Sequence, residues 1–360
     1  MTTSVLPPAL GVCIVTYNAA DVITGCLATL FAAENVRLRV VVVDNASSDG
    51  TVARIRNWAA GTIPPEIPLD LPFESPHLTG PVALHEALPS APLDDNTTLT
   101  MLHAPVNGGF AAGVNLGLDH LMQDLDIDRF WILNPDCVVP PGTPAALAAH
   151  PAPPGSFALI GGRVSYLSPA GRIQSDGGRI NWLTGMTINV NRGRATAQTS
   201  PPSVDTLDFI SGASMVASRA FLEQAGLMPE DYFLYYEEVD WALRRGALPL
   251  LYCNRAPVYH HAGSTIGSGS VERVSTDFSV YFLYRARMRF LRRHCPRSLP
   301  VAFFYSLAKA VQHALRGQWA QFHALLRAIN GLRPPAAVRK RLSPETRAII
   351  DGAREKSYQR

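Results

Sequence analysis

Two short runs rich in β-branched residues, each followed by a segment of helix length, constrain the fold of this chain more than any other feature. The runs are LGVCIVTYN (10–18) and RLRVVVVDN (37–45), and the segments after them are AADVITGCLATLFAA and DGTVARIRNWAA. Both runs are apolar without the alternation of a half-exposed strand, so they predict a parallel sheet with both faces covered by helices. We therefore expect an α/β fold with a mostly parallel central sheet.

A third unit of the same kind begins with TTLTMLHA (97–104), continues into the helix-like segment 111–125 and returns with RFWILN (129–134). Residues 61–96, which precede it, contain eight prolines and few periodic apolar positions. This composition predicts a long surface insertion, either an acceptor-facing loop or a mobile segment. After Asp136, turns rich in Gly and Pro separate short strand-like runs, which favour an antiparallel appendage.

Positive charge is concentrated at the C-terminal end. From Arg285 onward there are 17 Lys/Arg against 3 Asp/Glu, whereas the residues before it contain 15 against 26. The sequence predicts a main domain at 1–275 and a basic helical extension at 276–360. The extension is either a solvated basic face or a surface for an anionic partner, such as a membrane or a phosphate-bearing acceptor. Nucleic acid is not expected, because no helix-turn-helix, zinc-finger or aromatic RNA-binding motif is present.

Several features predict a cytoplasmic protein. The five cysteines are scattered and include no C-x-x-C pair, so neither a disulfide framework nor a zinc knuckle is indicated. The N-terminal residues lack the basic region of a signal peptide. The apolar segment 299–315 contains Lys309 and His313 and is shorter than the roughly 20 residues that span a bilayer, which favours a packed helix. Peripheral association with the inner face of the membrane is compatible with the basic extension.

Polar clusters follow three of the predicted strands, at 16–18 (TYN), 44–45 (DN) and 134–136 (NPD). Each cluster alone is typical of a helix cap or a turn. Three in succession predict a binding rim, because ligands of open α/β sheets bind at the carboxyl ends of the strands. Asp44 is suited to accept the ring N–H of a uracil or thymine, with Tyr17 near the base. Asp136 is suited to a hard divalent cation, which often uses one or two carboxylates plus substrate phosphates.

Two further motifs leave alternatives open. The run VNGGFAAGVNLGL has neither the dinucleotide-binding nor the Walker spacing. Its glycines 109, 113 and 117 predict a helix that closely approaches either another part of the fold or a nucleotide. In YHHAGST (259–265), His260 and His261 precede a Gly/Ser-rich loop, so they are either satisfied structural groups or part of a phosphate-facing site.

The stretch FLYYEEVDWALRR (233–245) places three carboxylates within four positions. One interpretation is the first turn of a helix, where acidic side chains are favoured and Asp240 pairs with Arg244. The other is a general base beside a metal site. On a helix Glu238 points about 200° away from Asp240, whereas Glu237 and Arg244 share the face of Asp240, so both interpretations can hold together.

The motifs CIVTYN, VVDNASSDGT, NGGFAAGVN, WILNPDC, SGASMVASR, FLYYEEVDWALR and YHHAGS, in this order, resemble the motif series of glycosyltransferase family 2. The similarity is greatest to rhamnosyltransferase-like members that build bacterial surface polysaccharides, and it covers roughly residues 9–295. It implies a GT-A fold with a Rossmann-like sheet, a nucleotide-diphosphate sugar donor, a divalent cation (Mg²⁺ or Mn²⁺) and inversion at the anomeric carbon.

The resemblance also implies roles for individual residues. Glu238 matches the catalytic base, with Asp240 and Glu237 as the alternative bases, and Asp136 and His260 match the residues of the metal and diphosphate site. The nucleotide site would comprise Thr16, Tyr17, Asn18, Asp44, Asn107, Gly109, Phe110 and Asn115, and the acceptor or sugar pocket would comprise Gly212, Ala213 and Trp241. Two positions depart from the family pattern: Asn-Pro-Asp stands for Asp-x-Asp, and Glu238 replaces the more usual Asp.

These features together predict transfer of a sugar, with rhamnose from dTDP-rhamnose as the first choice, to a lipid-linked or growing surface glycan. A non-catalytic nucleotide-sugar-binding protein is the main alternative, and the Asn-Pro-Asp motif supports it. A sugar nucleotidyltransferase is a weaker alternative. It would need a basic residue among glycines near the N-terminus to hold a triphosphate, and residues 10–36 contain no Lys or Arg.

Overall fold

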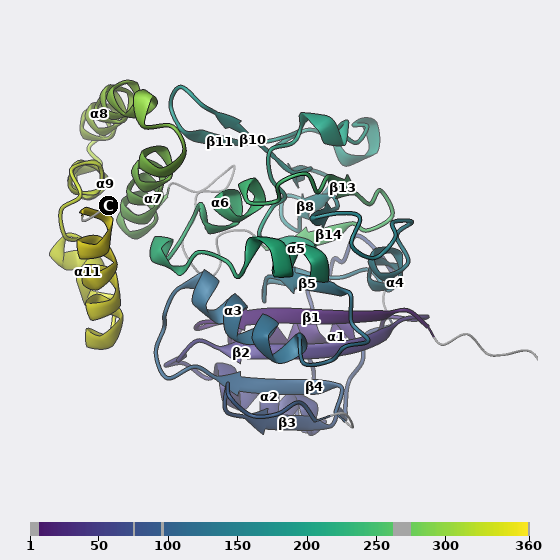
Figure 1. Cartoon of the computed structure of the whole chain (residues 1–360). Coiled ribbons are helices and arrows are strands. Elements are labelled where there is room, and N and C mark those ends of the chain that lie inside the picture. The colour runs from purple at the N-terminus through teal and green to yellow at the C-terminus, as the bar shows by residue number, and fades with distance from the viewer. Residues whose placement is uncertain (1–6, 75, 95–96, 262–274, 359–360) are drawn as a thin grey trace, which may run out of the picture.

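An eight-stranded sheet forms the centre of the computed structural model, which describes residues 7–74, 76–94, 97–261 and 275–358 (Figure 1). Neighbouring strands pair in parallel, except that β12 runs antiparallel to both β5 and β7. In order across the sheet the strands are β13 (Leu250–Tyr252), β7 (Leu159–Gly161), β12 (Ser214–Ser218), β5 (Arg129–Leu133), β1 (Ala9–Thr16), β2 (Arg37–Asp44), β4 (Leu99–His103) and β3 (Leu84–Ala87).

The predicted strands of the three sequence units are confirmed as β1, β2, β4 and β5. The register of β1 places Thr16 beside Asp44 on β2 and Ile14 beside Leu133 on β5. The carboxyl ends of these strands therefore meet at one edge of the sheet, as the parallel arrangement requires. The polar clusters that follow β1, β2 and β5 are brought to this edge.

Helices cover both faces of the sheet, because the strands are apolar on both sides. Ile23 of α1 and Ile55 of α2 belong to the hydrophobic cluster of one face, and Val114 of α3 and Phe221 of α5 belong to that of the other. The helices of this part are α1 (Ile23–Leu30), α2 (Thr51–Ala59), α3 (Phe110–Leu121), α4 (Gly142–Ala148), α5 (Arg219–Ala225) and α6 (Glu237–Leu243).

The proline-rich segment 61–96 contains an edge strand that the sequence did not predict. This strand, β3, pairs in parallel with β4. Other parts of the segment lie along α1, where Glu66 N donates to Thr24 Oγ1 at 2.9 Å and Leu78 N donates to Ala28 O at 3.0 Å. Few apolar residues mark β3, and its position depends on pairing with β4 rather than on its own pattern.

Much of the chain between β5 and β12 forms a hairpin and, together with β14 from beyond β12, a smaller sheet. The smaller sheet has the order β6 (Cys137–Val138), β14 (Val258–His260), β8 (Val164–Tyr166) and β9 (Ile173–Ser175), and the hairpin comprises β10 (Gly178–Asn181) and β11 (Met186–Asn189). The expected antiparallel pairing is confirmed for β8 with β9 and for β10 with β11. The expected place in an appendage is wrong for β7, which joins the central sheet between β12 and β13.

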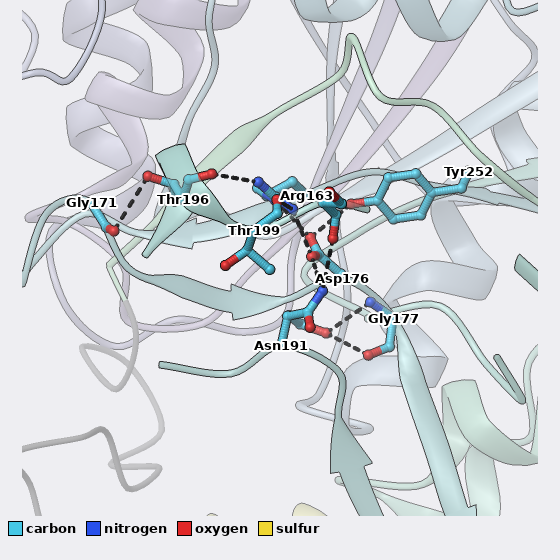
Figure 2. Close-up of polar contacts among 10 residues, drawn as sticks. Arg163, Gly171, Asp176, Gly177, Asn191, Thr196, Thr199 and Tyr252 are labelled. Atoms are coloured by element: carbon cyan, nitrogen blue, oxygen red, sulfur yellow. Dashed lines mark hydrogen bonds and ion pairs between the residues drawn. The ribbon is translucent and has the colours of Figure 1, made fainter. Parts of the chain in front are cut away.

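A buried carboxylate fixes this part of the chain (Figure 2). Asp176 accepts hydrogen bonds from Arg163 Nε and Nη2, both at 2.9 Å, from Asn191 Nδ2 at 2.8 Å and from the Tyr252 hydroxyl at 2.7 Å. Burial and the hydrogen bond to Asp176 raise the pKa of Tyr252. A fully buried charge with this many donors is satisfied, so the network holds β8, β9 and β13 in a fixed arrangement.

Helices form the C-terminal part of the described chain: α7 (Asp277–His294), α8 (Leu299–Leu315), α9 (Trp319–Ile329), α10 (Ala336–Lys340) and α11 (Pro344–Tyr358). Figure 1 shows them together beside the central domain. Much of the charge of α7 is turned inward. Arg285, Arg287 and Arg289 are buried, and Arg287 lies over the Tyr284 ring and bonds to Ser306. These three arginines of α7 therefore hold helices together, and they are not part of the predicted basic face.

Among the residues described, no helix combines the length and the hydropathy needed to cross a bilayer. The expectation of a packed helix at 299–315 is confirmed by α8, although only one of its faces is buried. The predicted domain boundary near 275 lies close to the start of α7 and stays a prediction.

Candidate functional site

The ends of β1 and β2 form the first part of the site. Asp44 is buried, and its two carboxylate oxygens accept from Thr16 Oγ1 at 3.3 Å and from Ser47 N at 3.2 Å. Asn18 joins the two strand ends, because its side chain accepts from Ser48 N at 2.8 Å. Thr16, Asp44 and Asn18 are thus brought together, with Tyr17 between Thr16 and Asn18 in the chain.

Asn45 connects this rim to the start of α3. Its amide nitrogen donates to Asn107 Oδ1 at 3.1 Å and to Gly109 O at 2.9 Å. Gly109 has φ 96°, and a Cβ there would lie 2.2 Å from Phe233 O, so only glycine fits. Phe110 N donates to the same Phe233 carbonyl at 3.1 Å. The predicted nucleotide segment therefore lies directly against the loop that leads into α6.

Asn115 and Gly113, further along α3, contact other parts of the protein. Asn115 donates to Met228 O at 2.9 Å and to Glu230 Oε1 at 2.8 Å, and it accepts from Met228 N at 2.9 Å. These bonds occupy its amide, and they give no support to its predicted contact with a nucleotide. A Cβ at Gly113 would lie 2.5 Å from Val15 Cγ1, so the close approach predicted for this helix is helix–strand packing.

The candidate metal residues are adjacent, with Asp136 Oδ1 2.9 Å from His260 Nε2. His260 Nδ1 lies 2.8 Å from Gln174 Oε1, an acceptor that favours the proton on Nδ1 and leaves the Nε2 lone pair facing Asp136. Two ligand atoms placed about 2.1 Å from one octahedral cation are themselves about 3.0 Å apart. The spacing of Asp136 and His260 therefore fits Mg²⁺ or Mn²⁺.

Cys137 also lies close to these atoms, since one donor atom from each of Asp136, Cys137 and His260 lies within 4.8 Å of the others. Its thiol is directed to Ala213 O at 3.6 Å, and burial raises its pKa well above the usual range. A hard cation prefers oxygen and imidazole to a protonated thiol. The fitting donor set is therefore Asp136 and His260. The predicted phosphate-facing loop at 262–265 lies outside the described residues.

The loop before α6 has an unusual backbone. Phe233, Tyr235 and Tyr236 have φ values of 69°, 68° and 71°, a region that costs a residue other than glycine about 1–3 kcal/mol. The Tyr236 hydroxyl donates to Gly185 O at 2.6 Å, and Phe110 N holds the Phe233 carbonyl. Contacts from α3 and from the β10–β11 hairpin thus fix the direction in which α6 begins.

Glu238, in the first turn of α6, is half-buried and lies beside Gly212. A Cβ at Gly212 would lie 3.6 Å from Glu238 Cγ, and the carbonyl of the next residue, Ala213, accepts from Asn134 N at 3.0 Å. Gly212 and Ala213 therefore connect Glu238 to the segment that ends in Asp136. Glu238 therefore lies beside Gly212, and the residues on either side of Asp136, Asn134 and Cys137, contact Ala213.

The two glutamates of α6 differ in environment. Burial raises the pKa of Glu238 to about 7. Glu237 is almost fully buried, and its pKa is raised well above the usual range by burial and by the neighbouring Glu238 charge. Within the described part of the chain, Glu237 Oε2 has no hydrogen-bond partner. Glu238 is the carboxyl that is both ionisable near neutral pH and accessible.

Asp240 is fully buried and braces the helix. It accepts from the Tyr232 hydroxyl at 2.7 Å, from Arg244 Nε at 2.8 Å and from Arg293 Nη1 at 2.5 Å, and His294 Nε2 lies 3.2 Å away. Burial alone would raise the pKa of Asp240, but the hydrogen bonds outweigh it and lower the pKa. The predicted pair with Arg244 is confirmed.

Trp241 belongs to the core. It is fully buried, its ring packs against Phe221 with centroids 4.8 Å apart, and its Nε1 donates to Gly226 O at 2.8 Å. This placement gives no support to its assignment to the acceptor pocket. Gly212 and Ala213 lie between Glu238 and Asn134, and their assignment to the acceptor or sugar pocket stays a prediction.

Asp240→Ala is expected to lower the free energy of unfolding by about 3 kcal/mol, because it removes one partner of a buried ion-pair network. Chemical denaturation of the two proteins measures this difference. Glu238→Gln is the matched comparison, and its effect on unfolding should stay within about 1 kcal/mol. Equal stability of Asp240→Ala and the unmodified protein would contradict the bracing role.

Sequence reasoning missed two residues that hold the site. Gln174 orients His260, and Arg293 secures Asp240 from the C-terminal helices. No sequence pattern indicates either role, because both depend on pairing between distant elements. Asn45 was expected on the binding rim as part of the 44–45 cluster, but its bond to α3 was not expected.

Comparisons with known proteins bear on the family and the fold of this chain. Residues 11–68 match the model of glycosyl transferase family 2. This match confirms the resemblance to glycosyltransferase family 2 over the segment that includes Thr16, Tyr17, Asn18 and Asp44. No curated protein matches the chain in a sequence search.

Solved structures support the fold. GalNAc-T7, solved with UDP, GalNAc and Mn²⁺, superposes with a TM-score of 0.54 at 12% identity over 85% of this chain. The matched region is 51% of that protein, so this chain spans about half of its length. This likeness confirms the expected GT-A fold, with its mainly parallel sheet and flanking helices.

Two further structures match at lower scores. The mannosyltransferase PcManGT from Pyrobaculum calidifontis, in complex with GDP-Man and Mn²⁺, has a TM-score of 0.47 at 17% identity, covering 98% of this chain and 87% of that one. S. aureus TarS 1–349 has a TM-score of 0.44 at 14% identity, with coverage of 97% and 87%.

Proposed function

We propose that this protein is an inverting glycosyltransferase that moves a sugar from a nucleotide-diphosphate donor to an acceptor hydroxyl. The observation that carries the proposal is that Glu238 lies beside Gly212, while the next residue, Ala213, accepts from Asn134 N in the segment that contains Asp136. Asp44 lies at the same edge of the sheet, at the end of β2. Transfer from a nucleotide sugar needs three functions together: recognition of the nucleobase, a site for the diphosphate, and a proton acceptor for the attacking hydroxyl.

The donor is held by the strand ends. Asp44 is buried and retains lone pairs for the ring N–H of a uracil or thymine, while Thr16 and Ser47 keep its carboxylate in place. Asp136 and His260 would hold Mg²⁺ or Mn²⁺, which neutralises the charge on a leaving diphosphate. The sugar would lie beside Glu238 and Gly212, which are in contact with each other.

Glu238 acts as the general base. The acceptor oxygen attacks the anomeric carbon on the face opposite the diphosphate, and the bond from that carbon to the diphosphate oxygen breaks, so the configuration inverts. The Glu238 carboxylate takes the proton of the attacking hydroxyl. A pKa of about 7 suits this role, because a substantial fraction of Glu238 is ionised at neutral pH and its conjugate base is strong enough to assist. Burial, by disfavouring the charged form, sets this value.

The motif resemblance to rhamnosyltransferase-like proteins supports dTDP-rhamnose as the first donor to test, with a lipid-linked or growing glycan as the acceptor. The test is a panel of UDP-, dTDP- and GDP-sugars, with release of nucleoside diphosphate as the readout in the presence of Mn²⁺. At least one donor should be consumed. Binding without consumption of any donor, with and without glycan acceptors, would overturn the proposal.

Asp44→Asn is expected to raise the KM for a UDP- or dTDP-sugar by about tenfold or more, because it replaces a charged acceptor that faces the base N–H. Steady-state kinetics with the donor identified by the panel measures this change. Asp70→Asn, an exposed substitution in the 61–96 segment, is the control and should leave KM unchanged. An unaltered KM in Asp44→Asn would show that Asp44 does not bind the nucleobase of the donor.

One observation favours a second function, the binding of a nucleotide sugar without catalysis. Asn134 stands where the family pattern has a carboxylate, and its Nδ2 lies 3.2 Å from His260 Nε2, the atom offered to the cation. The two functions are distinguished by the same panel: a binding protein would retain donor affinity and release no nucleoside diphosphate.

A further inference from the structure

The exposed face of α8 is the surface that the proposed function leaves unexplained. Figure 1 shows α8 beside α7 and α9, in the helical part away from the central sheet. The side chains that α8 buries are small: Ala302, Ser306 and Ala310 are each 0% exposed. Large apolar side chains point the other way, with Phe304 68% and Leu315 84% exposed. This pattern is the reverse of an ordinary surface helix, which buries its large residues.

The exposed side chains form a continuous stripe. They are Val301, Phe304, Ala308, Val311 and Leu315, spaced by three or four residues and therefore on one face of the helix. Trp319, at the start of α9, is also exposed and follows the end of the stripe, where His313 Nδ1 and Gln318 Oε1, 2.6 Å apart, close the turn between the helices. A contiguous apolar face of this kind on a water-facing surface marks an interaction site.

The charges around the stripe indicate its partner. Residues 278–344 contain thirteen Lys/Arg and no Asp or Glu. Three of these cations, Arg285, Arg287 and Arg289, are buried in α7, but Arg297 and Arg316 are exposed at the two ends of α8. An apolar face bounded by cations, with an aromatic residue at its margin, fits the interface between anionic headgroups and acyl chains.

We propose that α8 docks on an anionic lipid bilayer, with Phe304, Val311 and Leu315 inserted at the headgroup boundary. Arg297 and Arg316 lie where they reach lipid phosphates, and their attraction adds to the burial of apolar surface. A second copy of this chain is a poorer occupant. Two α8 helices packed antiparallel around a twofold axis would bring Arg297 of one against Arg316 of the other, with no acidic residue of α8 to compensate.

Co-sedimentation of the full chain with vesicles tests the proposal. Vesicles of equal parts phosphatidylcholine and phosphatidylglycerol should bind the protein, and vesicles of phosphatidylcholine alone should bind it more weakly. Phe304→Ser combined with Leu315→Ser is expected to lower the binding constant for the anionic vesicles by about tenfold or more. Arg297→Gln combined with Arg316→Gln should lower it by roughly tenfold and reduce its salt dependence.

A matched control removes exposed leucines elsewhere. Leu69→Ser with Leu125→Ser, at positions 102% and 85% exposed, should leave vesicle binding unchanged. The substituted side chains of α8 are exposed, so thermal unfolding should show retained folding in every variant. Undiminished binding of the Phe304/Leu315 variant would overturn the proposal, as would a dimer in solution that this variant dissociates. Nucleoside diphosphate release with a soluble acceptor should be equal in all variants, which separates this test from that of the glycosyltransferase function.

Discussion

Glu238→Gln is expected to lower turnover of the donor by at least about 10²-fold, the usual contribution of a positioned general base. The amide cannot take the proton of the acceptor hydroxyl, yet it has nearly the same shape and lies against the same backbone at Gly212. The KM for the donor should therefore change little. Steady-state transfer kinetics, with product formation followed by mass spectrometry, measure both constants.

The pH profile gives this prediction a second readout. A base works in its ionised form, so with a pKa of about 7 the rate should fall as pH drops below 7 and level off above it. Because Glu237 is the adjacent residue, the apparent value belongs to the pair of carboxyls. The residual activity of Glu238→Gln should not show this fall in rate below pH 7. Glu223→Gln, on the exposed surface of α5, serves as the control and should keep both the rate and the profile. Full activity of Glu238→Gln would show that another group is the general base.

Asp136→Asn is expected to abolish measurable binding of Mn²⁺ in the presence of nucleoside diphosphate and to lower turnover by about 10²-fold or more. The reason is that the charge stabilisation supplied by a catalytic cation is worth several kcal/mol, and each 1.36 kcal/mol is tenfold in rate. The two carboxylate oxygens of Asp136 are the only acidic oxygens in the Asp136, Cys137 and His260 group. Isothermal titration with Mn²⁺ and UDP measures the binding directly.

Cys137→Ser is the matched comparison for that prediction. The Cys137 thiol is buried and directed to Ala213 O, and a hydroxyl can donate to the same carbonyl. Binding of Mn²⁺ should therefore survive this substitution. The donor set of Asp136 and His260 would be contradicted if Asp136→Asn bound Mn²⁺ normally or if Cys137→Ser lost it.

The part of the fold that could be predicted from sequence is the part whose pattern is local. The apolar runs of β1, β2, β4 and β5 predict parallel strands, and parallel strands place their following polar residues at one edge. This reasoning brought Asp44 and Asp136 to the same edge. The spacing of Asp240 and Arg244 also predicts their pair, because residues four apart on a helix are neighbours.

Features that depend on distant pairing could not be predicted. Gln174 reaches His260 because β9 pairs with β8, which pairs with β14. Arg293 looked like one of many surface cations in a basic segment, yet it binds Asp240 and Asp231. The alternation of small and large residues along α8 predicts a helix with two faces, but not that the large residues point away from the protein.

Residue type also proved a weak guide to role within a motif. Asn115 and Trp241 lie inside matching motifs, but the amide of Asn115 is used by the segment 228–230 and Trp241 is enclosed by the core. Glycines in these motifs were a better guide to which segments lie close together. The absence of a side chain at Gly109 allows the Phe233 carbonyl to approach α3, and this approach sets the loop that leads into α6.

A crystal structure with Mn²⁺ and UDP or dTDP bound is the most direct test of the central claim that Asp44, Asp136 and Glu238 serve one donor site. The claim predicts the base beside Asp44, the cation on Asp136 and His260, and the β-phosphate directed toward Gly212 and Glu238. An open hollow of about 510 Å³, lined in part by Pro202, Leu251 and Tyr252, offers a different place. A nucleotide bound in that hollow, with no cation on Asp136, would contradict the account.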